Sequence, residues 1–251
     1  MLDQGLDQAA GLRRMLVAPG LNLMAFPVTA GGSDLWIAQL AHTLRAQGMR
    51  PVVIDASRGA VARSFGLRLR HELLDLLEGA LEFDRVARAT PDGVWVLRAE
   101  RGVEAFVASG ASSRRLFSAL ARQSHGFDAV LLVMPAGELA CLASPAQAVP
   151  VVALDSGGAG LMRAYATVKQ LACDFGYNRF AVVMRGLADA AQAQQAYARF
   201  AAVARTFLGA EVSMAGWLPG PSGNAAGALA DLAQTLLHTA ATPLAQANLA
   251  A

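Results

Sequence analysis

The amino-acid sequence predicts a single α/β domain built on a doubly wound, mainly parallel sheet. The chain has 251 residues and is 55% hydrophobic, which is enough to bury a substantial core. Short apolar runs alternate with helical stretches along the chain, and this alternation is typical of βαβ units. Several runs, such as 129–134, are continuous Ala, Val, Leu and Met, as expected for strands covered on both faces.

The elements follow one another without an internal linker. The predicted strands are 22–28, 51–55, 94–98, 129–134, 149–154, 180–184 and 212–218. The predicted helices are 33–48, 71–79, 113–125, 159–175, 188–207 and 225–239. We therefore expect an N-terminal helical extension over 1–20, the α/β domain over 21–240, and a flexible tail over 241–251. The tail is Ala-rich after Pro243.

Composition excludes several classes of function. The 21 basic and 19 acidic residues leave a net charge of +2, so no strong field attracts nucleic acid or acidic lipid. Cys141 and Cys173 form no close-spaced motif, and with four scattered His they do not suggest a zinc site. The acidic start of the chain and the absence of a long apolar run predict a cytoplasmic protein without a signal peptide.

The loop after the first predicted strand is the expected ligand site, because ligands of such sheets bind at the carboxyl ends of the strands. Phosphate binding needs a backbone nest, a Lys and a Ser or Thr for Mg²⁺. The loop keeps Gly31 and Gly32, but the only lysine of the chain is Lys169. Ser33 and Asp34 suit the cap of the next helix, and Asp34 places a negative charge where a phosphate would lie.

This layout resembles the opening of the MinD/ParA family of P-loop ATPases. In that comparison the two lysines of the family fall on Ala30 and Leu35, the magnesium-binding Thr on Trp36, and the last loop glycine on Asp34. The resemblance implies the fold and a vestigial phosphate loop. That loop comprises Ala30, Gly31, Gly32, Ser33, Asp34, Leu35 and Trp36.

Two further nucleotide elements of the family are also changed. The acid that organises magnesium falls on Val133, which the earlier Asp128 does not replace, and the Asn that reads adenine falls at Met184-Arg185. Asp55 resembles the strand-end acid of the family, but without phosphate we expect it to cap the next turn. The resemblance thus implies a pseudo-ATPase with no catalytic residue, no cofactor and no ATP or Mg²⁺ binding.

The predicted strand 149–154 is followed by Asp155-Ser156-Gly157-Gly158 and then by a predicted helix. Such a segment can form an anion-binding nest or cap the helix. Capping is the interpretation we favour.

The resemblance to the family extends over about 20–240. The segments that carry it are His71–Gly79, Thr90–Leu97, Leu161–Leu171, Phe207–Gly209 and Gly216–Pro219. The 161–171 segment also has the apolar spacing of a core-facing helix.

The N-terminus resembles one branch of the family. Residues 6–14, Leu-Asp-Gln-Ala-Ala-Gly-Leu-Arg-Arg, match the DQAxxLR signature of FlhG (also FleN or YlxH), the MinD-like regulators of flagellar number and placement. There the segment forms a helix that docks on the GTPase FlhF and stimulates its GTP hydrolysis. The residues implied in partner binding are Leu6, Asp7, Gln8, Ala9, Leu12 and Arg13. The apolar stripe of this segment, Leu2, Leu6, Ala9 and Leu12 or Leu16, suits a groove on a partner. The alternative is that it packs on the chain's own domain.

The resemblance implies a non-catalytic, nucleotide-independent regulator that binds FlhF and contacts flagellar switch proteins or a flagellar transcription regulator. It would be a monomer or an ATP-independent dimer, recruited to the cell pole through partners. Residues 218–251 contain no Lys or Arg, so we expect no strong membrane binding. The alternatives are a MinD-like accessory protein of cellulose secretion or pilus assembly, an atypical ATPase, and an unrelated enzyme on the same fold.

Overall fold

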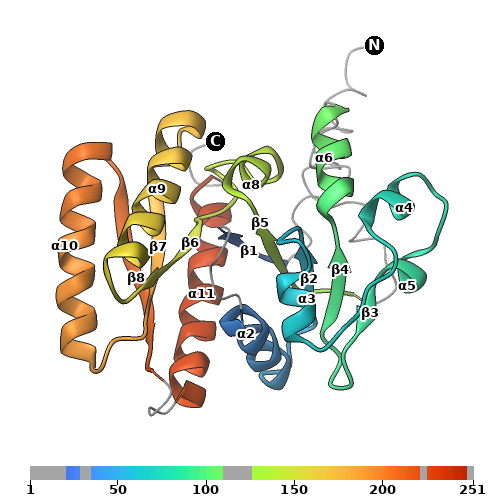
Figure 1. The fold of residues 1–251 in the computed structure, drawn as a ribbon, viewed down its shortest axis with the longest axis horizontal. Coiled ribbons are helices and arrows are strands. Elements are labelled where there is room, and N and C mark those ends of the chain that lie inside the picture. The colour runs from blue at the N-terminus through green and yellow to red at the C-terminus, as the bar shows by residue number, and fades with distance from the viewer. Residues whose placement is uncertain (1–20, 29–34, 110–125, 221–224, 248–251) are drawn as a thin grey trace.

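The computed structural model describes residues 21–28, 35–109, 126–220 and 225–247, the last seven by their backbone alone. Within these ranges the strands form one layer with helices on both faces (Figure 1). The strands are β1 (Asn22–Pro27), β2 (Pro51–Asp55), β3 (Arg88–Ala89), β4 (Trp95–Arg98), β5 (Ala129–Met134), β6 (Val151–Asp155), β7 (Arg179–Arg185) and β8 (Glu211–Leu218). This arrangement confirms the predicted doubly wound α/β fold.

The strand layer consists of two hydrogen-bonded sheets that meet at a seam. Five strands follow the order β1-β5-β2-β4-β3 and three follow the order β6-β7-β8. Every ladder is parallel except that of β3 with β4. Across the seam, β1 and β6 lie side by side, joined by a single isolated bridge between Ala25 and Pro150.

Burial explains why the central strands are apolar throughout. All residues of β2 and β5 are buried, because helices cover both faces of the sheet there. The core therefore divides into one apolar cluster under α2 (Leu35–Ala46) and α11 (Ala225–Ala247), and two clusters on the opposite face.

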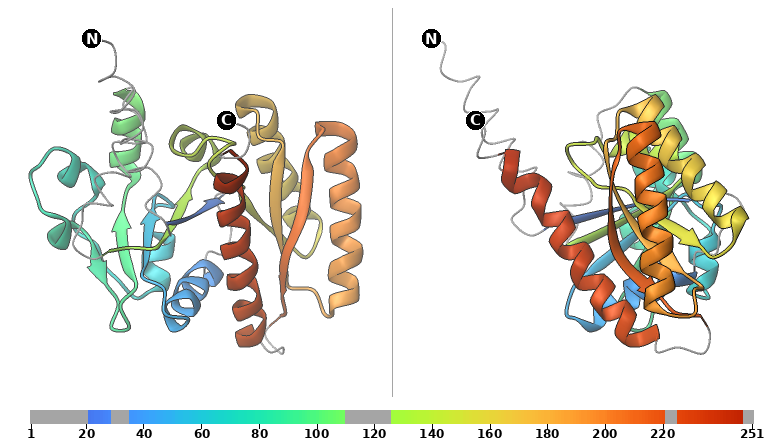
Figure 2. Two further views of the ribbon diagram at one scale, coloured as in Figure 1. Left: turned by 180° about the vertical axis from the view of Figure 1, so that it is seen from behind. Right: turned by 90° about the vertical axis from the view of Figure 1, so that its left-hand side faces the viewer.

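The helices fall on opposite faces of the layer. α11 packs against α2, β1 and β8, while α9 and α10 cover the other side (Figure 2). The remaining helices are α3 (Ala60–Ser64), α4 (Leu73–Leu77), α5 (Phe83–Val86), α6 (Glu100–Ala108), α8 (Ala136–Leu142), α9 (Gly158–Phe175) and α10 (Ala190–Leu208).

The seven predicted strands are confirmed, with ends that shift by up to two residues. The two-residue β3 and the helices α3, α5, α6 and α8 were not predicted. The elements β3, α3, α5 and α8 have at most seven residues, which are too few to show a helical period. The nine residues of α6 do have an amphipathic pattern, which the sequence analysis missed. The predicted end of the last helix at 239 is wrong, since α11 runs past Pro243 to Ala247. The flexibility of the tail stays a prediction. The predicted helices over 1–20 and 113–125 lie outside the described residues.

Pro27 sits in β1 without disturbing a ladder, although a central strand rarely accommodates proline. The backbone N–H groups of Asn22 and Val28 donate to Asp128 and Met134, on the β5 side. Because N–H groups alternate in direction along a strand, the nitrogen of Pro27 faces the seam instead. The missing donor thus falls on the side where β1 and β6 share one bridge.

Candidate functional site

The expected ligand site lies between the end of β1 and the start of α2. Its residues Ala30, Gly31, Gly32, Ser33 and Asp34 lie outside the described residues, whereas Leu35 and Trp36 open α2. Leu35 is half exposed and Trp36 is 5% exposed. The position that resembles a magnesium-binding Thr therefore holds a large aromatic side chain turned into the core.

Trp36 joins elements from both sides of the seam. Its ring meets that of Phe26 edge to face, with 5.5 Å between centroids. The guanidinium carbon of Arg185, at the end of β7, lies 5.9 Å from the Trp36 ring centroid. This distance is within the range of cation–π attraction, which stabilises an arginine that is largely removed from water.

Asp155, the last residue of β6, pairs with two arginines. One carboxylate oxygen lies 3.4 Å from Nη2 of Arg163 on α9, and the other lies 3.4 Å from Nε of Arg185. The side chain of Arg185 is only 17% exposed. We call Trp36, Asp155, Arg163 and Arg185 the seam cluster, because its members reach across the boundary between the two sheets.

A glycine makes this pairing possible. A Cβ at Gly160 would lie 2.4 Å from the carbonyl oxygen of Asp155, so only glycine lets α9 start so close to the end of β6. The close start brings Arg163, one turn further on, within reach of the Asp155 carboxylate.

Two spaces adjoin the seam cluster. A small, partly open cavity of about 40 Å³ is lined by the cluster itself together with Phe26, Ile37 and Thr167 among others, which is room for about one water. A wider pocket of about 470 Å³ lies between α2, the ends of β7 and β8, and α11. Trp36, Gln39, Arg185, Leu218 and Leu229 line it together with backbone. Its wall is mostly apolar, and its polar side chains are Gln39, Asp155, Ser156 and Arg185.

The strand end of β5 holds Val133, where the family resemblance places a magnesium-organising acid. Val133 is fully buried and lies in register with Phe26 on β1 and Asp55 on β2. Its side chain belongs to the apolar cluster under α2 and α11. Asp128 lies at the other end of this strand, where it accepts the backbone N–H of Arg50 at 2.6 Å.

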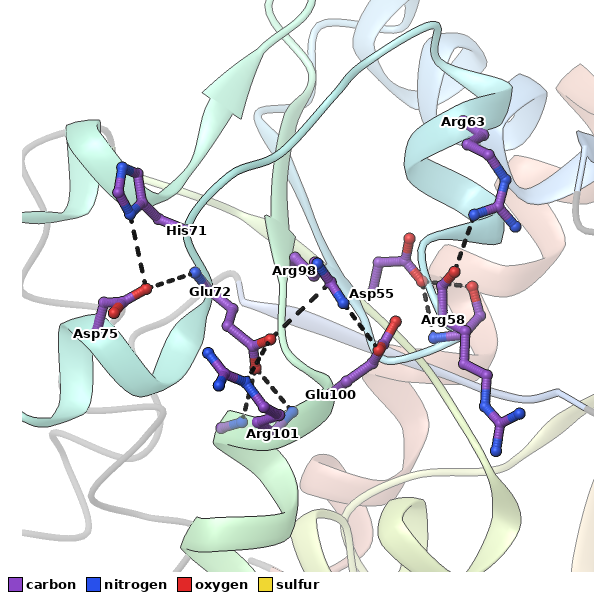
Figure 3. A network of polar contacts seen from close by, with 11 residues as sticks. Asp55, Arg58, Arg63, His71, Glu72, Asp75, Arg98, Glu100 and Arg101 are labelled. Atoms are coloured by element: carbon purple, nitrogen blue, oxygen red, sulfur yellow. Dashed lines mark hydrogen bonds and ion pairs between the residues drawn. The ribbon is translucent and has the colours of Figure 1, made fainter.

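Asp55 caps the turn that follows β2, as the sequence predicts. It is completely buried, and its carboxylate accepts the backbone N–H groups of Ser57 and Ala62, each at 2.8 Å, and the Ser57 hydroxyl. Figure 3 shows Asp55 beside the turn that leads into α3. A buried carboxylate with three donors is satisfied, so its role is to fix the start of α3.

The prediction that Asp155 or Ser156 caps the following helix is wrong. Gly157 is the residue before α9, and no side chain caps it. The N–H of Ser156 donates to the carbonyl of Arg185, at 2.9 Å. The carboxylate of Asp155 turns to the two arginines instead, because they supply charged donors that a helix end lacks.

A group of three glutamates surrounds the start of α6 and α8. Burial raises the pKa of Glu138 on α8, and the negative charges of Glu104 and Glu100 raise it further. One carboxylate oxygen of Glu138 is buried without a hydrogen-bond partner among the described residues. No three His, Cys, Asp or Glu side chains in the described ranges are arranged to hold a metal ion.

A buried glutamate tethers α4 to α6. Glu72 is 3% exposed and accepts the backbone N–H groups of Arg101 and Gly102, at 2.7 and 3.1 Å. Its other oxygen lies 3.2 Å from Nε of Arg101 (Figure 3). The contacts satisfy the first N–H groups of α6, so Glu72 has a structural task.

The sequence analysis pointed to Trp36 and Arg185 only as positions where residues of the family are replaced. It did not predict that the two side chains lie close together. The residues implied in partner binding, Leu6, Asp7, Gln8, Ala9, Leu12 and Arg13, lie outside the described residues. No signal in the sequence pairs Asp155 with Arg185, because thirty positions and a helix separate them and only the β6–β7 register brings them together.

Comparison with known proteins identifies the fold. No protein-family model matches the chain, and no curated protein matches it. Among solved structures, a chain of the MinC:MinD cell division protein complex of Aquifex aeolicus superposes with a TM-score of 0.58. The two chains are 15% identical, over 86% of this chain and 96% of that one. The chain has a MinD/ParA-like P-loop NTPase fold.

Two other structures support this assignment. Apo McdA of Cyanothece gives a TM-score of 0.55 at 16% identity, over 89% of this chain and 99% of that one. A plasmid partition protein of Borrelia burgdorferi gives 0.54 at 8% identity, over 87% and 98%. Because the identities are so low, the MinD/ParA-like likeness concerns the fold. In the described ranges, every helix is too short or too polar to cross a membrane.

Proposed function

We propose that this MinD/ParA-like chain is a nucleotide-independent, FlhG-like regulator of flagellar number and placement. It binds the GTPase FlhF through residues 6–14 and stimulates GTP hydrolysis there. Its α/β body contacts flagellar switch proteins or a flagellar transcription regulator. The protein acts in the cytoplasm and reaches the cell pole through these partners, as a monomer or a dimer indifferent to ATP.

One observation supports nucleotide independence above all. Trp36 is 5% exposed, packs on Phe26, and lies next to Arg185, which is paired to Asp155. The side chain at the expected magnesium position is thus part of the core. A Thr hydroxyl can ligate Mg²⁺ from that position, but an indole ring offers no acceptor for the ion.

Partner binding rests on the sequence signature Asp7-Gln8-Ala9 followed by Leu12-Arg13. A short helix with an apolar stripe binds a groove on its partner, and polar side chains beside that stripe can reach a phosphate-transfer site. The chain also provides an internal control, since Leu-Asp-Gln occurs at 2–4 and again at 6–8, and only the second copy continues into the signature.

The test measures GTP hydrolysis by FlhF with the full-length chain. We expect stimulation by the unaltered protein, loss of stimulation in Asp7→Ala/Gln8→Ala, and retention in the matched control Asp3→Ala/Gln4→Ala. If both variants behave alike, the signature is not the contact. If even the unaltered chain has no effect, the proposal fails and an accessory role in secretion or pilus assembly takes its place.

A second measurement addresses nucleotide. Calorimetric titration with Mg·ATP should show no saturation up to about 1 mM, and light scattering should give the same mass with and without ATP. Saturable binding with ATP-dependent dimers would instead identify an atypical ATPase, and phosphate release would confirm it.

A further inference from the structure

The segment between β2 and α4 is the most one-sidedly charged part of the described structure. Residues 56–71 contain Arg58, Arg63, Arg68 and Arg70 and no Asp or Glu. All four arginines are exposed. We call them the arginine strip. The chain as a whole has a net charge of only +2, so this concentration is local.

The backbone under the strip is held in a fixed course. Asp55 anchors the first turn of α3 through the N–H of Ala62. Gly66, with φ of +70°, ends the helix, and the N–H of Leu67 returns to the carbonyl of Ala62 at 3.0 Å. The guanidinium of Arg63 donates to the carbonyl of Arg58 at 3.0 Å, which keeps the first two arginines together (Figure 3).

The second half of the strip alternates between partly buried and exposed residues. Leu67 and Leu69 are partly buried against the core under α2, while Arg68 and Arg70 between and after them are exposed. In an extended chain, alternate residues share one side and lie about 6.6 Å apart. The alternation of burial therefore turns Arg68 and Arg70 outward, away from the core that Leu67 and Leu69 contact.

The acidic groups around the strip already have partners. Asp55 is occupied by the turn of α3, Asp75 lies 3.8 Å from His71, and Glu72 binds Arg101. On the α2 side, Asp92 pairs with His42 at 2.5 Å. None of the ion pairs found among the described residues includes an arginine of the strip.

The classes of negatively charged partner differ in the contacts that they require besides pairing with positive charge. Nucleic acids are bound through many phosphate contacts, or through exposed aromatic rings on which bases stack. A membrane surface needs apolar side chains that enter the lipid. None of the large exposed apolar residues of the described structure lies between 56 and 71. Guanidinium groups bind carboxylates through paired N–H donors, and this pairing needs neither stacking rings nor inserted apolar side chains beside it.

We propose that the arginine strip is a docking surface for an extended acidic segment of a partner protein. The fixed turn of α3 and the alternating burial at 67–70 present exposed guanidinium groups along the segment, to which the carboxylates of a partner can pair. Electrostatic attraction of this kind speeds association and selects the partner. The surface is separate from residues 6–14 and does not depend on FlhF.

The test uses a fluorescent peptide of alternating Glu and Ala as the probe, titrated with the full-length chain. Binding should weaken as salt rises, and the charge-reversal variant Arg68→Glu/Arg70→Glu should weaken it at least about tenfold. The neutral variant Arg68→Gln/Arg70→Gln should fall between. The matched control Arg179→Glu/Arg205→Glu makes the same change of charge at exposed positions of β7 and α10. Its affinity for the peptide should stay within about twofold of that of the unaltered chain.

Circular dichroism first confirms that each variant is folded. The proposal is overturned if the reversal at 68 and 70 affects the peptide no more than the control does. It is also overturned if duplex DNA or phosphatidylserine vesicles bind more tightly than the peptide and lose affinity in the same variant, because the strip would then serve a different class of partner.

Discussion

Two strands of the sheet end in the same way but treat their final aspartate differently. β2 and β6 each have five residues and finish in Asp55 and Asp155, respectively. Asp55 is buried and satisfied by donors from the seven residues that follow it. Asp155 is partly exposed and depends on Arg163 and on Arg185, which comes from the next strand. The same local pattern therefore gives a turn cap in one half and a long-range ion pair in the other.

The reason for the difference lies in the donors that each loop supplies. After β2, the backbone N–H groups of Ser57 and Ala62 donate to the carboxylate, and the N–H of Val61 donates to the Ser57 hydroxyl. After β6, the glycines lead directly into α9, and no neighbouring side chain donates to Asp155 from that turn. An aspartate without local donors is stabilised by charged groups from elsewhere in the fold.

The largest effect should come from removing the local cap. Asp55→Ala leaves the N–H groups of Ser57 and Ala62 unpaired in the core, so we expect a loss of about 3 kcal/mol in the free energy of unfolding. Urea denaturation measures it. Asp174→Ala, at an exposed position of α9, is the control and should change stability by less than about 0.5 kcal/mol. Similar values for the two variants would contradict the role of Asp55.

High pH should weaken the half that contains Asp155. Burial raises the pKa of Tyr177 to about 12, and the negative charge of the Cys141 thiolate adds to this. Its hydroxyl donates to the carbonyl of Ala143. Because the folded-state pKa lies above the unfolded value near 10, this stabilisation is complete below pH 10. It is lost as pH rises towards 12, by about 2–3 kcal/mol.

Denaturation at a series of alkaline pH values tests this expectation. In Tyr177→Phe, the decline between pH 10 and pH 12 should become shallower, although the variant starts from a lower stability. An identical decline in both proteins would show that another group controls the alkaline transition.

The ion pair at the end of β6 should contribute less than the cap at the end of β2. Asp155→Asn removes the charge that holds two arginines, and since Arg163 is 39% exposed, solvent screens much of the interaction. We expect a loss of about 1 kcal/mol. High salt should reduce this loss but leave that of Asp55→Ala unchanged. A double-mutant cycle with Arg163→Gln measures the coupling, and zero coupling would contradict the pair.

The smallest effect should arise at the seam itself. Pro27→Ala restores an N–H that points towards β6, where one bridge joins the two sheets. With no ladder to complete, the free energy of unfolding should change by less than about 0.5 kcal/mol. A gain well above that value would mean that β1 and β6 pair more extensively than the single bridge indicates.

The sequence by itself determined where the strands lie along the chain and that strands alternate with helices. Runs such as those of β2 and β5 are apolar at every position, and this pattern needs no knowledge of distant residues. It also predicted the cap at Asp55, because donors and acceptor lie within eight residues of one another. Short helices such as α3 escaped prediction, since five residues show no periodicity.

Only the tertiary structure decided how Trp36, Asp155, Arg163 and Arg185 come together. They belong to α2, β6, α9 and β7, and the sequence contains no spacing that relates them. The parallel register of β6 with β7 places Asp155 opposite Arg185, and the packing of α2 beside the seam brings in Trp36. Local hydrogen bonds can be predicted from neighbouring residues, whereas ion pairs across a sheet depend on which strands become neighbours.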